Sequence, residues 1–158
     1  MALEHGARAS SPTLTFLFTD IERHSELWDA YPEAMSDALQ DHDDLVNAAV
    51  TEAEGRVVKN EGDGVMAVFA DASRAVGAAI AIQRALATRE WPEIGSLRVR
   101  MGLNAGVADS RGNDYFGPEV IKAARLCAGA NGGQVVATRA VVELARGVEE
   151  VLTVVEHE

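Results

Sequence analysis

The chain contains few of the residues that several common modes of action require. Lysine occurs only at Lys59 and Lys122 among 158 residues, and acidic side chains outnumber basic ones by 25 to 14, giving a net charge of −11. Nucleic-acid and anionic-membrane surfaces need clustered basic side chains, so we expect neither partner. The single cysteine, Cys127, cannot form a disulfide within the chain, and no apolar run reaches the 18 residues of a membrane span.

Two patterns that would indicate other kinds of catalysis are also missing. The sequence has no glycine-rich P-loop and no Ser-His-Asp arrangement, which argues against P-loop NTPases and triad hydrolases. The histidines lack the spacing of zinc ligands, and we expect all of them at the surface. They are His5, His24, His42 and His157.

Length and composition favour one domain. A chain of 158 residues with 47% hydrophobic residues can build a single core. Residues 1–12 lack the apolar segment of a signal peptide, so we expect a flexible leader and then one domain over residues 13–158. The sequence therefore predicts a cytoplasmic protein.

Hydrophobic periodicity predicts alternating strands and helices over the first hundred residues. Leu14 to Phe18 form a nearly continuous apolar run, typical of a buried strand, and helical spacing follows from Pro32 to about Val50. Two strands flank the turn Gly62-Asp63-Gly64. We expect Ser73 to cap a long alanine-rich helix, and residues 97–103 alternate as a half-buried strand. This β-α-β-β-α-β order is ferredoxin-like.

The remaining residues add further elements to that core. The sequence predicts a helix from Pro118 to Ala128, a strand from Gln134 to Ala137, a helix from Thr138 to Arg146 and a last strand near Val148 to Val155. The expected fold class is α+β, with a ferredoxin-like βαββαβ core and additional C-terminal α/β elements.

Two aspartates lie just beyond apolar strands, where the backbone holds a side chain firmly. Asp20 follows the first strand, and Asp63 lies in the turn between the second and third. Two carboxylates at one spot repel each other unless a cation or a shared proton is present. Oxygen ligands without cysteine or histidine suit Mg²⁺ or Mn²⁺. Alternatively, both aspartates bond to local backbone in turns.

Four segments, in order, resemble the catalytic domain of class III nucleotide cyclases. They are Phe18-Thr-Asp20-Ile21, Lys59-x-x-Gly62-Asp63, Arg98 to Gly106, and Asp114-Tyr-Phe-Gly117 continued to Arg125. The resemblance covers roughly residues 13–155. The Asp-Tyr-Phe-Gly-Pro segment is most similar to the actinobacterial branch of this family.

The resemblance implies an adenylate cyclase that converts ATP to 3′,5′-cyclic AMP and pyrophosphate, with two Mg²⁺ or Mn²⁺ ions per site. Asp20, Asp63 and the backbone carbonyl of Ile21 would hold the ions. Arg125 would stabilise the transition state. Arg100 would contact the triphosphate, although its place in the alternating strand also suits a solvated arginine.

The resemblance assigns base selection to Lys59 and Asp114. Lysine would donate to a ring nitrogen of adenine, and the aspartate would accept from its exocyclic amine. Alternatively, Lys59 is a strand-edge charge and Asp114 belongs to a turn. In this family the site lies between two catalytic domains, so one chain that carries both sets of residues implies a head-to-tail homodimer with two equivalent sites.

Three departures from the family pattern bear on activity. Ile121 stands where relatives carry an asparagine that helps the transition state, so we expect slow turnover. Arg23 replaces a usual glycine, and Asn104 replaces a common histidine. Two other interpretations therefore stay open. One is a degenerate homologue that binds nucleotide or dimerises without turnover, and the other is a different metal-dependent nucleotidyl enzyme on a related core.

Overall fold

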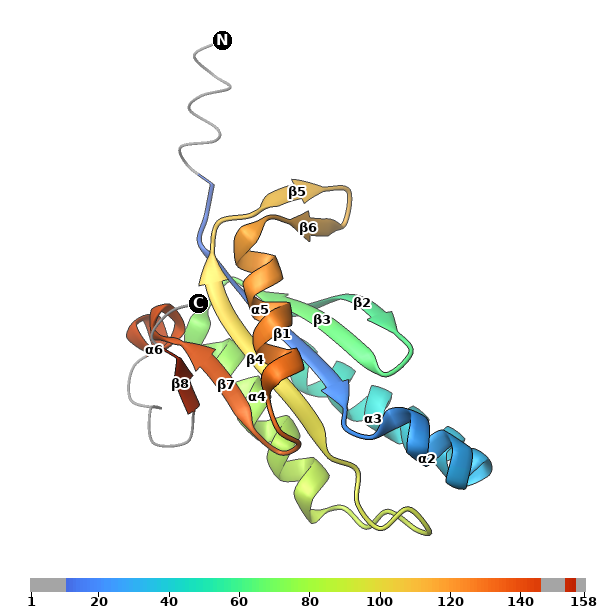
Figure 1. Cartoon of the computed structure of the whole chain (residues 1–158). Helices are drawn as coiled ribbons and strands as arrows, with labels where there is room; N and C mark the ends of the chain where they lie inside the picture. Colours follow the sequence, from blue (N-terminus) through green and yellow to red (C-terminus); the bar gives the residue numbers. More distant parts are fainter. Residues whose placement is uncertain (1–10, 146–152, 156–158) are drawn as a thin grey trace.

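The chain folds into alternating strands and helices around one six-stranded sheet (Figure 1). The structure is a computed structural model and describes residues 11–145 and 153–155. Its helices are α2 (His24–Ala30), α3 (Pro32–Glu52), α4 (Ala72–Thr88), α5 (Pro118–Gly129) and α6 (Arg139–Ala145). Its strands are β1 (Leu14–Ile21), β2 (Arg56–Glu61), β3 (Gly64–Phe69), β4 (Val99–Gly106), β5 (Asp109–Arg111), β6 (Asp114–Phe116), β7 (Val135–Thr138) and β8 (Thr153–Val155).

Strand β1 lies in the middle of the main sheet, whose order is β2-β3-β1-β4-β7-β8. It runs antiparallel to both neighbours, with Leu17 opposite Ala67 of β3 and Leu103 of β4. The strands β1 to β4, with α3 and α4 between them, form the predicted ferredoxin-like βαββαβ core. Strands β7 and β8 extend the sheet in parallel beside β4. The predicted fold class is confirmed.

The two faces of the sheet carry separate apolar clusters, because side chains alternate along each strand. Leu17 and Ile21 of β1 face the larger cluster, to which α3, α4 and α6 contribute. Phe16 faces the smaller cluster, which Val120 and Ala123 of α5 complete. Helix α5 therefore covers one face of the sheet, and α3 and α4 cover the other (Figure 1).

Helix α5 approaches β4 most closely at Gly102. A side-chain carbon at this position would overlap the backbone nitrogen of Cys127 and the carbonyl oxygen of Ala123, both in α5. Backbone atoms cannot move aside as a flexible side chain can, so glycine is required for this contact. The absence of a side chain at Gly102 thus sets the distance between the helix and the sheet.

Two helix beginnings differ from the sequence prediction. Asp71 rather than Ser73 caps α4, because its carboxylate accepts the backbone amides of Ser73 and Arg74 at 2.8 and 3.2 Å. The Ser73 hydroxyl donates to the carbonyl of Ala145 at 2.8 Å and so joins α4 to α6. Helix α2 has no counterpart among the predicted elements. It follows Arg23, whose φ of 61° lies in the left-handed region.

One histidine that the sequence analysis places at the surface is buried. His42 is 0% exposed, and its Nδ1 lies 2.9 Å from the carboxylate of Asp43. The prediction is wrong here because Ala38, His42 and Val46 follow one another at intervals of four residues and share the buried stripe of α3. His5 and His157 lie outside the described residues.

Helix α5, strand β7 and helix α6 match their predicted positions to within about one residue. The predicted last strand is confirmed over Thr153–Val155, and residues 146–152 of that region lie outside the described residues, as do residues 1–10 of the predicted leader. The hairpin of β5 and β6 was not predicted from the sequence. Among the described residues, no helix has both the length and the hydropathy of a bilayer-spanning segment.

Replacing Gly102 by alanine should destabilise the fold. The added carbon forces α5 away from β4, and such overpacking costs about 1–3 kcal/mol in the free energy of unfolding. Gly77 is the matched control, since it lies on the exposed side of α4 and an added carbon there meets nothing within 4 Å. Gly77→Ala should stabilise by about 0.5–1 kcal/mol. Urea denaturation measures both changes, and an unaltered Gly102→Ala protein would contradict the close contact.

Candidate active site

The two strand-end aspartates lie at the same edge of the sheet. Strands β1 and β3 pair Thr19 with Val65, so Asp20 and Asp63 each lie within two residues of that pair. Burial raises the pKa of the Cys127 thiol in α5 to about 12, and the negative charges of both carboxylates also raise it. Asp20 and Asp63 are called the carboxylate cluster below.

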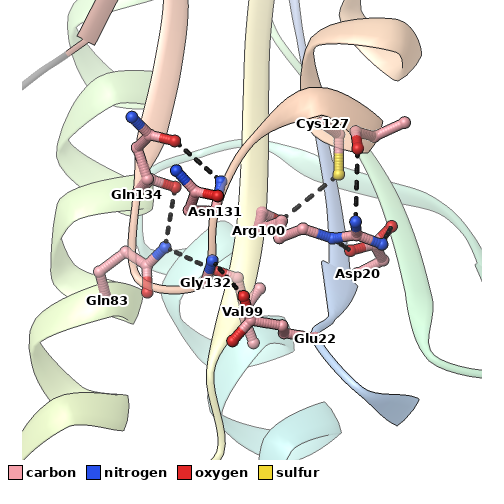
Figure 2. A network of polar contacts seen from close by, with 10 residues as sticks. Asp20, Glu22, Gln83, Val99, Arg100, Cys127, Asn131, Gly132 and Gln134 are labelled. Atoms are coloured by element: carbon pink, nitrogen blue, oxygen red, sulfur yellow. Dashed lines mark hydrogen bonds and ion pairs between the residues drawn. The ribbon is translucent and has the colours of Figure 1, made fainter. Parts of the chain in front are cut away.

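Arg100 forms a two-pronged ion pair with Asp20 (Figure 2). Its Nε donates to one carboxylate oxygen at 2.6 Å, and its Nη2 donates to the other at 2.9 Å. Its Nη1 donates to the carbonyl of Ala128, near the end of α5, at 3.3 Å. The hydrogen bond from Asp20 raises the pKa of the Arg100 guanidinium above its usual value. Arg100 is therefore held beside the carboxylate cluster rather than extended into solvent.

The sequence analysis did not identify this ion pair. It assigned Arg100 to a triphosphate by resemblance, or to solvent by strand alternation. The structure places Arg100 directly opposite Asp20 in the register of β4 with β1. Only the strand pairing shows this, because 80 residues separate the two in the chain.

The donor atoms of the carboxylate cluster fit a divalent metal of the Mg²⁺ or Mn²⁺ type. The Asp63 carboxylate accepts no hydrogen bond among the described residues, so it is available to a cation. Within the same residues, no group of three or more Asp, Glu, His or Cys side chains could hold a metal ion. An ion held by Asp20, Asp63 and the Ile21 carbonyl would thus take its remaining ligands from water and substrate phosphates. Metal binding here would also have to replace Arg100 on Asp20.

Lys59 and Asp114 meet in a second cluster. The Lys59 ammonium lies 3.0 Å from the Asp114 carboxylate, although 55 residues separate them. The bond from Lys59 lowers the pKa of the Asp114 carboxyl below its usual value, and the backbone amide of Tyr115 adds to this effect with a hydrogen bond of 2.7 Å. Both side chains stay partly exposed, so a ligand can reach them. Lys59 and Asp114 are called the hairpin cluster below.

Arg125 and Ile121 lie one turn apart on the outer face of α5. Together with Gly117 and Lys122, they line an open concavity of about 690 Å³. Arg125 is exposed, and its guanidinium has no hydrogen-bond or ion-pair partner among the described residues. Ile121 is 52% exposed. This surface is therefore accessible to a ligand or to a second protein chain.

A polar network around the buried Asn104 fixes the beginning of α5. The Asn104 amide donates to the carboxylate of Glu119 at 2.8 Å and to its backbone carbonyl at 3.0 Å. The hydroxyl of Thr138 in β7 donates to Asn104 at 2.8 Å. Asn104 is only 2% exposed, so its departure from the family pattern has a structural role. The sequence analysis missed Glu119 and Thr138, because no local signal marks their contact with Asn104.

Asp114 and Arg100 lie near opposite ends of α5. The helix begins directly after β6, which carries Asp114, and its end meets Arg100 through Ala128. Four of the predicted site residues of one chain therefore form two separate ion pairs, Lys59 with Asp114 and Arg100 with Asp20.

Comparison with known proteins agrees with the fold. The family model of the adenylate and guanylate cyclase catalytic domain matches residues 7–157. An adenylate cyclase from Podospora anserina is 33% identical over 171 residues, which cover 90% of this chain and 8% of the fungal protein. An uncharacterized protein from Mycobacterium tuberculosis is 36% identical over 137 residues, covering 85% of this chain and 46% of the mycobacterial one.

Solved structures show the same architecture. An adenylate cyclase from Trypanosoma brucei in its monomeric state aligns with a TM-score of 0.81 at 29% identity, covering 85% of this chain and 77% of that one. The chain spans less than a tenth of the length of the fungal adenylate cyclases that it matches. Since the family model covers nearly the whole sequence, the chain belongs to the adenylate and guanylate cyclase catalytic domain family.

Proposed function

We propose that this domain is an adenylate cyclase that converts ATP to 3′,5′-cyclic AMP and pyrophosphate. The hairpin cluster is the observation that carries the choice of ATP. Lys59 offers a donor and Asp114 an acceptor, 3.0 Å apart, which matches the ring nitrogen and the exocyclic amine of adenine. Guanine presents the opposite pattern to the same pair. Hydrogen bonds to charged groups are worth about 1.5–3 kcal/mol each, so the pair can discriminate between the bases.

In this reaction the ribose 3′-oxygen attacks the α-phosphorus, and the bond from that phosphorus to the bridging oxygen of pyrophosphate breaks. Two Mg²⁺ or Mn²⁺ ions, when bound, would stabilise the charge on the attacking and leaving oxygens. Asp20, Asp63 and the Ile21 carbonyl would hold these ions. Arg125, exposed and without a partner among the residues that the structure describes, would donate to the charge that develops on the phosphoryl oxygens.

Arg100 has two roles in this proposal. Without metal it neutralises Asp20, which would otherwise be an isolated carboxylate near the buried Cys127. With metal bound by the carboxylate cluster, the guanidinium would be free to contact the triphosphate. The family resemblance assigns Arg100 the second role, and the ion pair with Asp20 supports the first.

The arrangement of the two clusters favours a head-to-tail homodimer. We infer that the carboxylate cluster of one chain and the hairpin cluster and Arg125 of the other act on the same nucleotide. The open concavity beside Arg125 is consistent with a surface that a second chain completes. The reaction uses ATP, so the proposal places the domain in the cytoplasm. The mycobacterial relative supports assignment to the actinobacterial branch.

Ile121 is the reason to expect slow turnover. Its side chain cannot donate a hydrogen bond, and losing one transition-state donor lowers kcat by roughly 10²–10³-fold. Because Ile121 is 52% exposed, the fold of the single chain does not need an apolar residue there. This exposure also favours the second candidate function, a degenerate homologue that uses the surface for dimerisation and binds nucleotide without turnover.

The purified protein should form cyclic AMP from ATP with Mn²⁺, and should use GTP at least about tenfold less efficiently in kcat/KM. Asp63→Asn should abolish the activity without unfolding the protein, since the Asp63 carboxylate accepts no hydrogen bond among the described residues. Asp37→Asn removes the same charge from the exposed side of α3 and is the control. Chromatographic quantification of both cyclic products decides the matter. Equal use of GTP would contradict the choice of ATP, and an active Asp63→Asn protein would contradict the metal role.

Arg100→Gln should tighten the binding of Mn²⁺ to the nucleotide-free protein by about threefold to tenfold. The guanidinium occupies both oxygens of Asp20, so its removal frees a metal ligand and takes away a repelling charge. Arg98→Gln is the control, because Arg98 is exposed and donates to the Gly132 carbonyl at 3.4 Å. Electron paramagnetic resonance of free Mn²⁺ measures the binding. Unchanged or weaker binding by Arg100→Gln would show that the ion pair does not compete with metal.

A further inference from the structure

The hairpin that carries Asp114 is not paired with any described strand of the main sheet. Strands β5 and β6 have three residues each and form their own two-stranded sheet, separate from the main one. A two-stranded hairpin is only marginally stable by itself in water. The position of Asp114 relative to Lys59 therefore depends on the side chains that join β6 to the main sheet.

Arg56, the first residue of β2, makes such a connection. Its Nη1 donates to the carbonyl of Asn113 at 3.3 Å, and its Nη2 donates to the hydroxyl of Tyr115 at 3.4 Å. Its guanidinium also lies over the Tyr115 ring, 5.7 Å from the ring centre. Asn113 and Tyr115 are the two neighbours of Asp114 in the chain. Arg56 thus bonds to the hairpin on both sides of Asp114. The hydrogen bond to the Asp114 carboxylate itself comes from Lys59.

The Tyr115 ring is held from a second direction by the core. The buried ring of Phe16 in β1 lies 6.0 Å from it, centre to centre. Phe16 contributes an apolar contact that leaves the Tyr115 hydroxyl free, so the polar part of the attachment comes from Arg56. The guanidinium has the planar fork that suits two acceptors at once, which a lysine lacks.

The contact between Lys59 and Asp114 cannot serve as the attachment during nucleotide binding. When both side chains turn to a base, their mutual ion pair is weakened or exchanged for bonds to that base. Arg56 bonds to the neighbours of Asp114 and not to its carboxylate, so these hydrogen bonds can persist when a base binds. We propose that Arg56 is a positioning residue for base selection, which keeps Asp114 at the distance from Lys59 that a purine base requires. This inference rests on the proposed function of the hairpin cluster.

Arg56→Gln should loosen the hairpin and weaken base selection together. Without nucleotide, amide hydrogen exchange over residues 109–116 should become about tenfold faster. With nucleotide, the preference for ATP over GTP in kcat/KM should fall by about tenfold, mainly through a higher KM for ATP, because Arg56 does not contact the reacting phosphate. Arg56→Lys should recover only part of the preference.

Arg89→Gln is the matched control. The Arg89 guanidinium also lies over an aromatic ring, that of Trp91 at 5.4 Å, and also donates a hydrogen bond, to Asp41 at 2.8 Å, but it makes no contact with the hairpin. This variant should keep both the exchange rate and the ATP preference. In an Asp114→Asn background, Arg56→Gln should cause no further loss of preference, because Arg56 acts through Asp114.

Two results would overturn the inference. One is an exchange rate over residues 109–116 that Arg56→Gln leaves unchanged. The other is a loss of ATP preference that is equally large with and without Asp114, since that would show a direct effect of Arg56 on the base. A wild-type protein that binds neither nucleotide would overturn the proposed function and the base-selection role together. The exchange rates would still decide whether Arg56 holds the hairpin.

Discussion

The close contact of α5 with β4 at Gly102 sets where the helix lies beside the two functional clusters. The helix can lie against the sheet because Gly102 has no side chain to meet Cys127 and Ala123. From this position its beginning follows directly on the hairpin strand with Asp114, and its end accepts a hydrogen bond from Arg100. Arg125 is presented between these two ends. A shift of α5 would therefore displace Arg125 and disturb the helix contacts next to Asp114 and Arg100.

In the single chain, each cluster contains a carboxylate that is already bound in an ion pair. Arg100 holds Asp20, and Lys59 holds Asp114, although the chain as a whole has a net charge of −11. These pairs keep the charged groups ordered and partly neutralised in the absence of ligand. Under the proposed function, metal would compete with Arg100 for Asp20, and a base would compete with the Lys59–Asp114 pair. Part of the binding energy would then be used to open contacts that keep the site ordered.

The sequence predicts those features that local patterns determine. The apolar run at Leu14–Phe18 and the helical spacing from Pro32 predict the βαββαβ core, and the strand ends place Asp20 and Asp63 together. It does not predict contacts between distant segments, such as Asp20 with Arg100 or Arg56 with Tyr115. The three-residue strands of the hairpin are too short to show periodicity, and His42 is misplaced when its residue type is weighed above its helical position. The roles of all the predicted site residues stay predictions, since they rest on family resemblance and on the geometry of one chain; these residues are Asp20, Ile21, Lys59, Asp63, Arg100, Asp114 and Arg125.

The central claim is that one nucleotide is shared between two chains, and complementation tests it most directly. Asp63→Asn damages the carboxylate cluster, and Arg125→Ala damages the opposite half, so each homodimer should be inactive. In an equal mixture about half of the dimers are mixed, and each mixed dimer has one intact site of two, so about a quarter of the wild-type cyclic AMP formation should return. No recovery, with mixed dimers demonstrated by mass spectrometry, would contradict the account and show that each site lies within a single chain.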